Sequence, residues 1–323
     1  MINVDLDFYS KFITALKTIV PEKGQLAVSL AEILHIEKVA VYRRLRGEVP
    51  FTFAEIVQIS KRLNLSMDEI IGVTPEYQGI PFYLNFHNYF NLVEDNYKML
   101  DSYVESVKPS LRNRQPSELG SASLFLSKCW AIMHSEVFKF FVMKWLYQFG
   151  NNVDVVPYSK IILPDWLETR NVEYTNLIKE IDYSYYIFHE NAFVSIVRDI
   201  QYFNAIKLIS DEDIIVLKEA LAKLLDTMED IARKGEYENG NKVELYVSSL
   251  NFDNSYGYFY SNNVNIGLID VFSINTVTSS NSIACEKIRT WLQAIKRSSM
   301  LISNSEINRI TYFEKQRKIL SIL

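Results

Sequence analysis

Residues 26–46 contain two short helical patterns separated by only a few residues. These two patterns limit the possible folds of the N-terminal part of the chain more than any other feature. Apolar residues recur at helical spacing on both sides of the break, at Leu30, Ile33, Leu34, Val41 and Leu45. Gly47 follows the second pattern, where a glycine commonly caps the end of a helix. Two helices this short bury their apolar faces only by packing on further helices, so we expect a small helical bundle.

The flanking sequence supplies the other helices of this bundle. Leu6 to Ile19 is amphipathic, and Pro21 and Gly24 end it. Thr52 is placed to cap a helix that continues to Leu63, and Ser66 begins a final helical turn. These patterns together predict a five-helix bundle over residues 1–73.

Charge is distributed unevenly within this bundle. Residues 1–73 carry nine basic and nine acidic side chains, but four of the ten residues from Glu37 to Arg46 are basic and one is acidic. The outward face of this helix presents five residues: Lys38, Val39, Tyr42, Arg43 and Arg46. A helix with such a face fits the major groove of DNA, where Arg and Lys donate hydrogen bonds to guanine edges and to phosphates.

The segment LAEILHIEKVAVYRRLRG, residues 30–47, resembles the helix-turn-helix of Cro/XRE-type, phage-repressor-like regulators. Pro50, Phe51 and the stretch LSMDEI at residues 65–70 extend the likeness, which covers about the first quarter of the chain. Ala27 stands where the family often has a glutamine, and Arg44 stands where it usually has Trp or Ile.

The resemblance implies a role for each outward residue. It places Lys38, Val39, Tyr42 and Arg43 at base edges and Arg46 at a phosphate. It also implies a double-stranded DNA operator as the partner. A single bundle contacts one half-site, so we expect a homodimer on a two-fold operator.

Residues 74–81 form the predicted linker, because Gly and Pro are frequent in this stretch. Residues 82–323 form the predicted second domain, with a regulatory or dimerisation role. Its long helical patterns cover residues 83–107, 119–149, 164–182, 185–209, 210–233, 282–296 and 305–320. Alternating patterns predict strands over residues 243–250, 256–260 and 264–275, separated by Asn-containing turns. The expected fold class is therefore mainly α: an N-terminal five-helix helix-turn-helix bundle, then a larger helical α+β domain with a small antiparallel sheet.

Two patterns in the second domain have alternative interpretations. Ile214, Leu217, Leu221, Leu224, Met228 and Ile231 follow heptad spacing, which fits either a dimer seam or the core of the domain itself. The aromatic residues Tyr183, Tyr185, Tyr186 and Phe188 either line a ligand pocket or belong to the core, and the core is the commoner place for such residues.

The remaining signals mainly exclude classes of protein. The four histidines have no metal-ligand spacing, and the two cysteines, Cys129 and Cys285, form no ligand pair. No phosphate-binding glycine loop or nucleophile motif occurs, so we expect no metal, no cofactor and no enzymatic activity. The start of the chain is acidic and no apolar run is long enough to span a bilayer, which predicts a cytoplasmic protein without a membrane partner.

We therefore expect a sequence-specific DNA-binding transcriptional regulator whose second domain serves dimerisation or senses a small-molecule or peptide effector. The alternative is a protein-interaction or scaffold module that retains the helical bundle without binding DNA. The surface of the helix at residues 37–46 distinguishes the two, because only DNA binding requires a continuous positive strip on it.

Overall fold

The computed structural model describes residues 4–19, 23–63, 65, 67, 70, 82–85, 105, 107–111, 116–149, 156–261, 264–271 and 275–323. The chain divides into two compact units, residues 1–79 (the N-terminal unit) and residues 80–323 (the large unit). The predicted linker at residues 74–81 lies outside the described residues.

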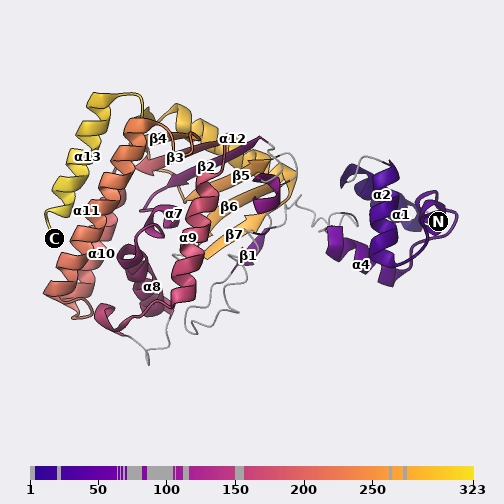
Figure 1. Cartoon of the computed structure of the whole chain (residues 1–323), viewed down its shortest axis with the longest axis horizontal. Helices are drawn as coiled ribbons and strands as arrows, with labels where there is room; N and C mark the ends of the chain where they lie inside the picture. Colours follow the sequence, from indigo (N-terminus) through magenta and orange to yellow (C-terminus); the bar gives the residue numbers. More distant parts are fainter. Residues whose placement is uncertain are drawn as a thin grey trace. The chain divides into compact units, whose positions relative to one another are not determined.

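The described part of the N-terminal unit is helical (Figure 1). Its helices are α1 (Val4–Ile19), α2 (Lys23–Leu34), α3 (Lys38–Leu45) and α4 (Phe53–Leu63). Their buried side chains form one cluster that includes Phe12, Leu16, Leu30, Val41 and Ile59. The predicted fifth helix falls largely on residues outside the described ones, although Ile70 belongs to the same cluster.

The large unit is built on a mixed sheet, in which the described residues form eight strands in the order β1-β7-β6-β5-β2-β3-β4-β8. The strands are β1 (Tyr83–Asn85), β2 (Ser117–Ser123), β3 (Tyr183–His189), β4 (Lys242–Ser248), β5 (Tyr256–Ser261), β6 (Asn265–Val271), β7 (Asn275–Ser279) and β8 (Met300–Leu301). β2, β3 and β4 are parallel neighbours, whereas β5, β6 and β7 form an antiparallel meander. β2 joins the two parts, because it also pairs antiparallel with β5.

Helices cover both faces of this sheet. They are α7 (Lys128–Ala131), α8 (Ser135–Phe149), α9 (Asp165–Lys179), α10 (Ala192–Ala205), α11 (Asp211–Lys234), α12 (Ser282–Arg297) and α13 (Glu306–Leu320), with a short 3-10 turn at η2 (Tyr158–Lys160). Side chains of β3 alternate between the faces: Tyr186 and Phe188 pack with α8, α10, α11 and α13, whereas Tyr185 and Ile187 pack with α12.

The expectation of a mainly α chain with a small antiparallel sheet is wrong, because the large unit is an α/β domain with a mixed sheet. The predicted helical stretch at 185–209 begins with β3, and the one at 119–149 begins with β2. β3 is buried on both faces, so its sequence YSYYIFH is rich in large aromatic and apolar residues and lacks a regular alternation of polar and apolar positions. Of the three strands predicted to form an antiparallel meander, those at 256–260 and 264–275 do pair antiparallel as β5 and β6. The strand predicted at 243–250 is β4, which pairs parallel with β3, and β7 completes the meander instead.

β2 lacks the usual sequence signs of a strand for a packing reason. A Cβ atom at Gly120 would lie 2.6 Å from the hydroxyl oxygen of Tyr185 and closer still to the ring of Tyr258. Because two tyrosine rings cross the backbone of β2 here, the strand uses small residues where β-branched ones are typical.

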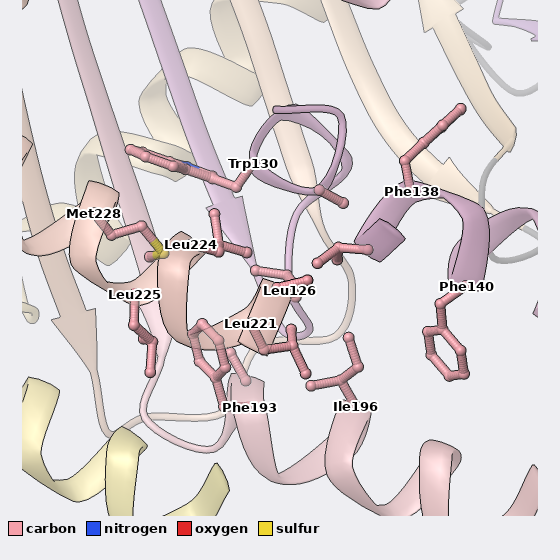
Figure 2. Close-up of a cluster of buried hydrophobic side chains, with 14 of the residues drawn as sticks. Leu126, Trp130, Phe138, Phe140, Phe193, Ile196, Leu221, Leu224, Leu225 and Met228 are labelled. Atoms are coloured by element: carbon pink, nitrogen blue, oxygen red, sulfur yellow. The ribbon is translucent and has the colours of Figure 1, made fainter. Parts of the chain in front are cut away.

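The heptad pattern on α11 belongs to the core of the large unit. Leu217, Leu221, Leu224 and Met228 are each at most 1% exposed. Figure 2 shows Leu221, Leu224 and Met228 among side chains of α8 and α10, including Phe140 and Phe193. The core alternative is therefore correct for these four residues. The same holds for Tyr185, Tyr186 and Phe188, which are each at most 1% exposed.

Ion pairs hold α12 on the sheet in addition to its apolar contacts. Lys296 Nζ lies 2.9 Å from Glu244 Oε2 on β4, and Arg289 Nη2 lies 2.6 Å from Glu118 Oε2 on β2. Lys296 Nζ also lies 4.6 Å from the ring centroid of Tyr185. The middle and the C-terminal end of the helix are thus fixed to two different strands.

Helix ends in the large unit follow their sequence signals. Ser210 and Asp213 form a capping box at the start of α11, and Gly235 ends that helix in the left-handed conformation. At α13 the cap is Ser305, whose side chain accepts from the Asn308 amide. No helix in the described part of the chain combines the length and apolarity needed to cross a membrane.

Candidate nucleic-acid interface

The turn between α2 and α3 fixes how α3 is presented. His35 has a φ of 54°, in the left-handed region, and the amide of Ile36 donates to the carbonyl of Ala31 at 3.2 Å. His35 thus occupies the position of the turn where glycine is common. Val41 of α3 is fully buried against the cluster that contains Leu30, so one face of α3 is committed to the core.

The opposite face of α3 is open. The structure places all five predicted contact residues there as exposed side chains: Lys38, Val39, Tyr42, Arg43 and Arg46. Val39 is 67% exposed although it is apolar, and Tyr42 is 39% exposed. An exposed apolar and an exposed aromatic residue between basic ones give the face both methyl-contacting and hydrogen-bonding groups.

α3 ends in a Schellman motif centred on Gly47. Gly47 has a φ of 78°, its amide donates to Arg44 O at 3.0 Å, and the amide of Glu48 donates to Arg43 O at 3.0 Å. The prediction that Gly47 caps this helix is confirmed. The motif also brings Glu48 back beside the last turn of α3.

Glu48 pairs with two of the predicted contact residues. Its Oε1 atom lies 2.5 Å from Arg46 Nε, and its Oε2 atom lies 3.5 Å from Arg43 Nε. All three side chains are about half exposed, at 46% to 57%. The hydrogen bond from Arg46 lowers the pKa of the Glu48 carboxyl. Sequence reasoning missed this residue, although its position directly after the capping glycine was a usable signal.

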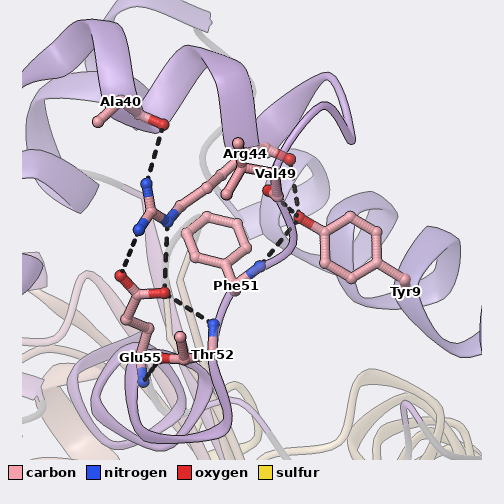
Figure 3. A network of polar contacts seen from close by, with 7 residues as sticks. All are labelled: Tyr9, Ala40, Arg44, Val49, Phe51, Thr52 and Glu55. Atoms are coloured by element: carbon pink, nitrogen blue, oxygen red, sulfur yellow. Dashed lines mark hydrogen bonds and ion pairs between the residues drawn. The ribbon is translucent and has the colours of Figure 1, made fainter.

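The Arg44 side chain is partly buried and stabilises the N-terminal unit, rather than belonging to the exposed face of α3 (Figure 3). Its Nη2 and Nε atoms bind Glu55 Oε1 and Oε2 at 2.9 and 3.3 Å, and both side chains are less than 20% exposed. Glu55 also accepts from the amide of Thr52, whose hydroxyl accepts from the Glu55 amide, so the two form a capping box for α4. Arg44 therefore ties α3 to the start of α4.

Tyr9 of α1 forms hydrogen bonds to the end of α3 and to the segment between α3 and α4. Its hydroxyl donates to the carbonyl of Arg44 at 2.8 Å and accepts from the amide of Phe51 at 3.3 Å. Burial raises the pKa of the Tyr9 hydroxyl, which therefore stays protonated and keeps its donor. The end of α3 is thus held by α1 and α4 together, as Figure 3 shows.

A metal site or a histidine-based site finds little support in the described residues. They contain no group of three or more His, Cys, Asp or Glu side chains that could hold a metal ion. His189 is buried at the end of β3, where its Nδ1 accepts from the amide of Asn191 at 3.2 Å. His134 is partly buried in the turn before α8, and burial lowers its pKa.

Comparison with known proteins identifies a family for the N-terminal part of the chain. Residues 12–88 match the family model of the BetR domain, a helix-turn-helix-like DNA-binding domain of regulators. The match supports a helix-turn-helix regulator in general and does not single out the Cro/XRE type. Neither the curated proteins nor the solved structures contain a match to the chain.

Proposed function

We propose that the chain is a sequence-specific transcriptional regulator that reads DNA with α3, in the manner of Cro/XRE-type repressors. The observation that carries the proposal is the exposed face of α3, which lies in a unit matched by the BetR domain. Lys38, Val39, Tyr42 and Arg43 contact base edges in the major groove, and Arg46 contacts a phosphate.

A homodimer on a two-fold operator is the second part of the proposal. One unit of this size reaches one half-site, and specific binding at physiological salt usually requires two. The second domain, residues 82–323 beyond a linker at 74–81, supplies the dimer contact or senses an effector, without enzymatic activity of its own. The α11 heptad is a poor dimer contact because four of its six residues, Leu217, Leu221, Leu224 and Met228, are buried in the core.

The direct test compares two arginines of α3. Arg43→Ala removes a bidentate guanine contact, so it should lower specific affinity by about 1–3 kcal/mol and relax the preference at one base position. Arg46→Ala removes a phosphate contact, so it should weaken binding to all sequences and reduce the slope of log affinity against log salt by about 1. Gel shifts on operators selected from random DNA measure both effects.

Arg62→Ala is the matched control, because Arg62 is an exposed arginine at the end of α4. It should leave the base preference unchanged. A protein that binds no DNA in selection would instead be a scaffold module, and the proposal would be rejected. It would also be rejected if Arg43→Ala and Arg46→Ala bound DNA as Arg62→Ala does.

A further inference from the structure

A cavity of about 540 Å³, here named the polar cavity, opens beside the carboxyl end of β2. The turn after β2, α8, α10 and the end of β6 form its wall. β2 and β3 are parallel, and α10 is the helix that follows β3. Ligands of open α/β sheets bind outside the carboxyl ends of the parallel strands, and sites of this volume hold small molecules. Position and size therefore both indicate a ligand site.

Two ion pairs from four different elements line the polar cavity. Lys128 Nζ of α7 lies 3.1 Å from Asp270 Oδ1 of β6. Lys144 Nζ of α8 lies 2.5 Å from Asp199 Oδ2 of α10. The four side chains are 23% to 35% exposed, and their charges sum to zero. A ligand with a single charge would face a like charge in each pair, whereas a ligand with both charges is complementary to both members of a pair.

A second cavity of about 160 Å³, here named the apolar cavity, shares Ser127, Lys128 and Asp270 with the polar cavity. Side chains of the sheet and of α9 line it, among them Leu119, Leu177, Ile178, Phe259, Ile266 and Leu268. The Lys128–Asp270 pair therefore lies where a charged environment meets an apolar one. A ligand at this pair can place a charged group on one side and an apolar group on the other.

We propose that the large unit binds a free α-amino acid with an apolar side chain at the Lys128–Asp270 pair. An α-amino acid carries its ammonium and carboxylate groups on a single carbon atom, so its two charges are as close as those of the pair. The ligand carboxylate binds Lys128 and the ligand ammonium binds Asp270, so that the four charges alternate in sign. The side chain enters the apolar cavity, whose volume suits a branched aliphatic or an aromatic group.

Occupation of this site is coupled to the fold of the large unit. Leu126, Phe140 and Ile196 line the polar cavity and also belong to the buried cluster around Leu221 (Figure 2). Ligand binding therefore stabilises the large unit against unfolding. The amino-acid binding itself does not depend on the proposed function, because it involves no DNA. Only the further step, that the amino acid acts as the effector of a DNA-binding regulator, rests on the proposed function.

Thermal unfolding of the full chain tests the binding. L-Leucine or L-phenylalanine should raise the unfolding midpoint by a few degrees at a concentration about 100 times its Kd. Isoamylamine and 4-methylpentanoate each carry the leucine side chain with only one of the two charges, so neither should raise the midpoint. L-Aspartate, whose side chain is charged, should not raise it either.

Substitutions locate the site. Asp270→Asn and Lys128→Gln should each abolish the shift caused by leucine. Asp230→Asn is the matched control, because Asp230 forms an exposed ion pair with Lys234 on α11, and this variant should retain the shift. If Asp270→Asn does not fold, Lys128→Gln and the one-charge analogues on the wild-type chain decide the question.

The inference is overturned if none of the twenty amino acids shifts the midpoint. It is equally overturned if isoamylamine or 4-methylpentanoate matches leucine, or if the two variants keep the shift. Gel shifts with and without leucine then test the effector role separately. A chain that binds leucine but no DNA would refute the proposed function and leave the amino-acid site standing.

Discussion

Glu48 Oε1 accepts a hydrogen bond from Arg46 Nε at 2.5 Å. In the absence of DNA, the guanidinium that we propose to bind a phosphate is therefore bound to a carboxylate of the protein itself. The same carboxylate lies 3.5 Å from Arg43 Nε. Phosphate must therefore compete with an internal anion, which also repels it. In the proposed interface we expect this arrangement to weaken the sequence-independent part of DNA binding, so that base contacts supply a larger share of the affinity.

Glu48→Gln should raise the affinity for non-specific DNA about threefold to tenfold, because it frees two cations and removes one repulsive charge. The salt slope should become steeper by about 1. Fluorescence anisotropy with random duplex DNA over a range of salt concentrations measures both. Glu32→Gln, at an exposed position of α2, is the matched control. Equal gains in the two variants would contradict a specific role for Glu48.

Arg44→Met should destabilise the N-terminal unit by about 1–3 kcal/mol, because Glu55 would be left partly buried without its ionic partner. Hydrogen exchange of α3 and α4 amides is the appropriate measurement, since all four tryptophans, Trp130, Trp145, Trp166 and Trp291, lie in the large unit. Arg46→Ala, at an exposed position, should leave these exchange rates nearly unchanged. Similar protection in both variants would show that the Arg44–Glu55 pair contributes little.

Leu221→Ala should lower the free energy of unfolding of the large unit by about 2–5 kcal/mol, because Leu221 is fully buried and its truncation leaves a cavity. Ile215→Ala on the same helix should change it by less than about 0.5 kcal/mol, since Ile215 is 60% exposed. Urea unfolding followed by tryptophan fluorescence measures both. A Leu221→Ala chain with wild-type stability and a lost dimer would restore the heptad as an oligomer contact.

Glu244 should make the large unit sensitive to acid. Burial alone would raise its pKa, but its pKa is lowered to about 2 by the hydrogen bonds that it accepts from Tyr183, Lys242, Lys296 and Tyr246. The folded-state pKa is below the unfolded-state value of about 4.3, so the stabilisation is present above that pH and is lost as the pH falls towards about 2.

The difference in urea midpoint between the wild type and Glu244→Gln should therefore be largest near neutral pH and shrink between about pH 5 and pH 2. Glu286→Gln is the control on α12, because the Glu286 side chain is 64% exposed. Its difference from the wild type should stay nearly constant over this range. A Glu244→Gln difference that does not change with pH would contradict the low pKa.

The N-terminal unit was predictable where local signals decide the structure. The outward face of α3 follows from the burial of Val41, and Gly47 is recognisable as a cap because its conformation favours glycine. The role of Arg44 was not predictable from its neighbours, because it depends on Glu55 of the next helix. The motif Thr52-Phe53-Ala54-Glu55 does indicate a capping box, but it does not reveal a second partner for its carboxylate.

In the large unit, local sequence signals predicted the wrong secondary structure where contacts with distant parts of the chain determine it. α11 was predicted well because Ser210 and Gly235 mark its ends chemically. β3 was assigned to a helix because burial on both faces removes the alternation that distinguishes a strand. β2 was missed because Gly120 accommodates tyrosines from β3 and β5. The ion pairs of the polar cavity join residues that are far apart in the sequence, so no local sequence pattern predicts that they are in contact.

The central position of β2 has a consequence for the synthesis of the protein. β2 ends at residue 123, but its partners are β3, which begins at residue 183, and β5, which begins at residue 256. During synthesis, the backbone N–H and C=O groups on both edges of β2 therefore remain unpaired with β3 and β5 until those strands have been made. The N-terminal helices form from local contacts and can fold soon after they emerge. We expect the nascent chain to acquire a DNA-binding surface while it still needs protection of this strand from aggregation.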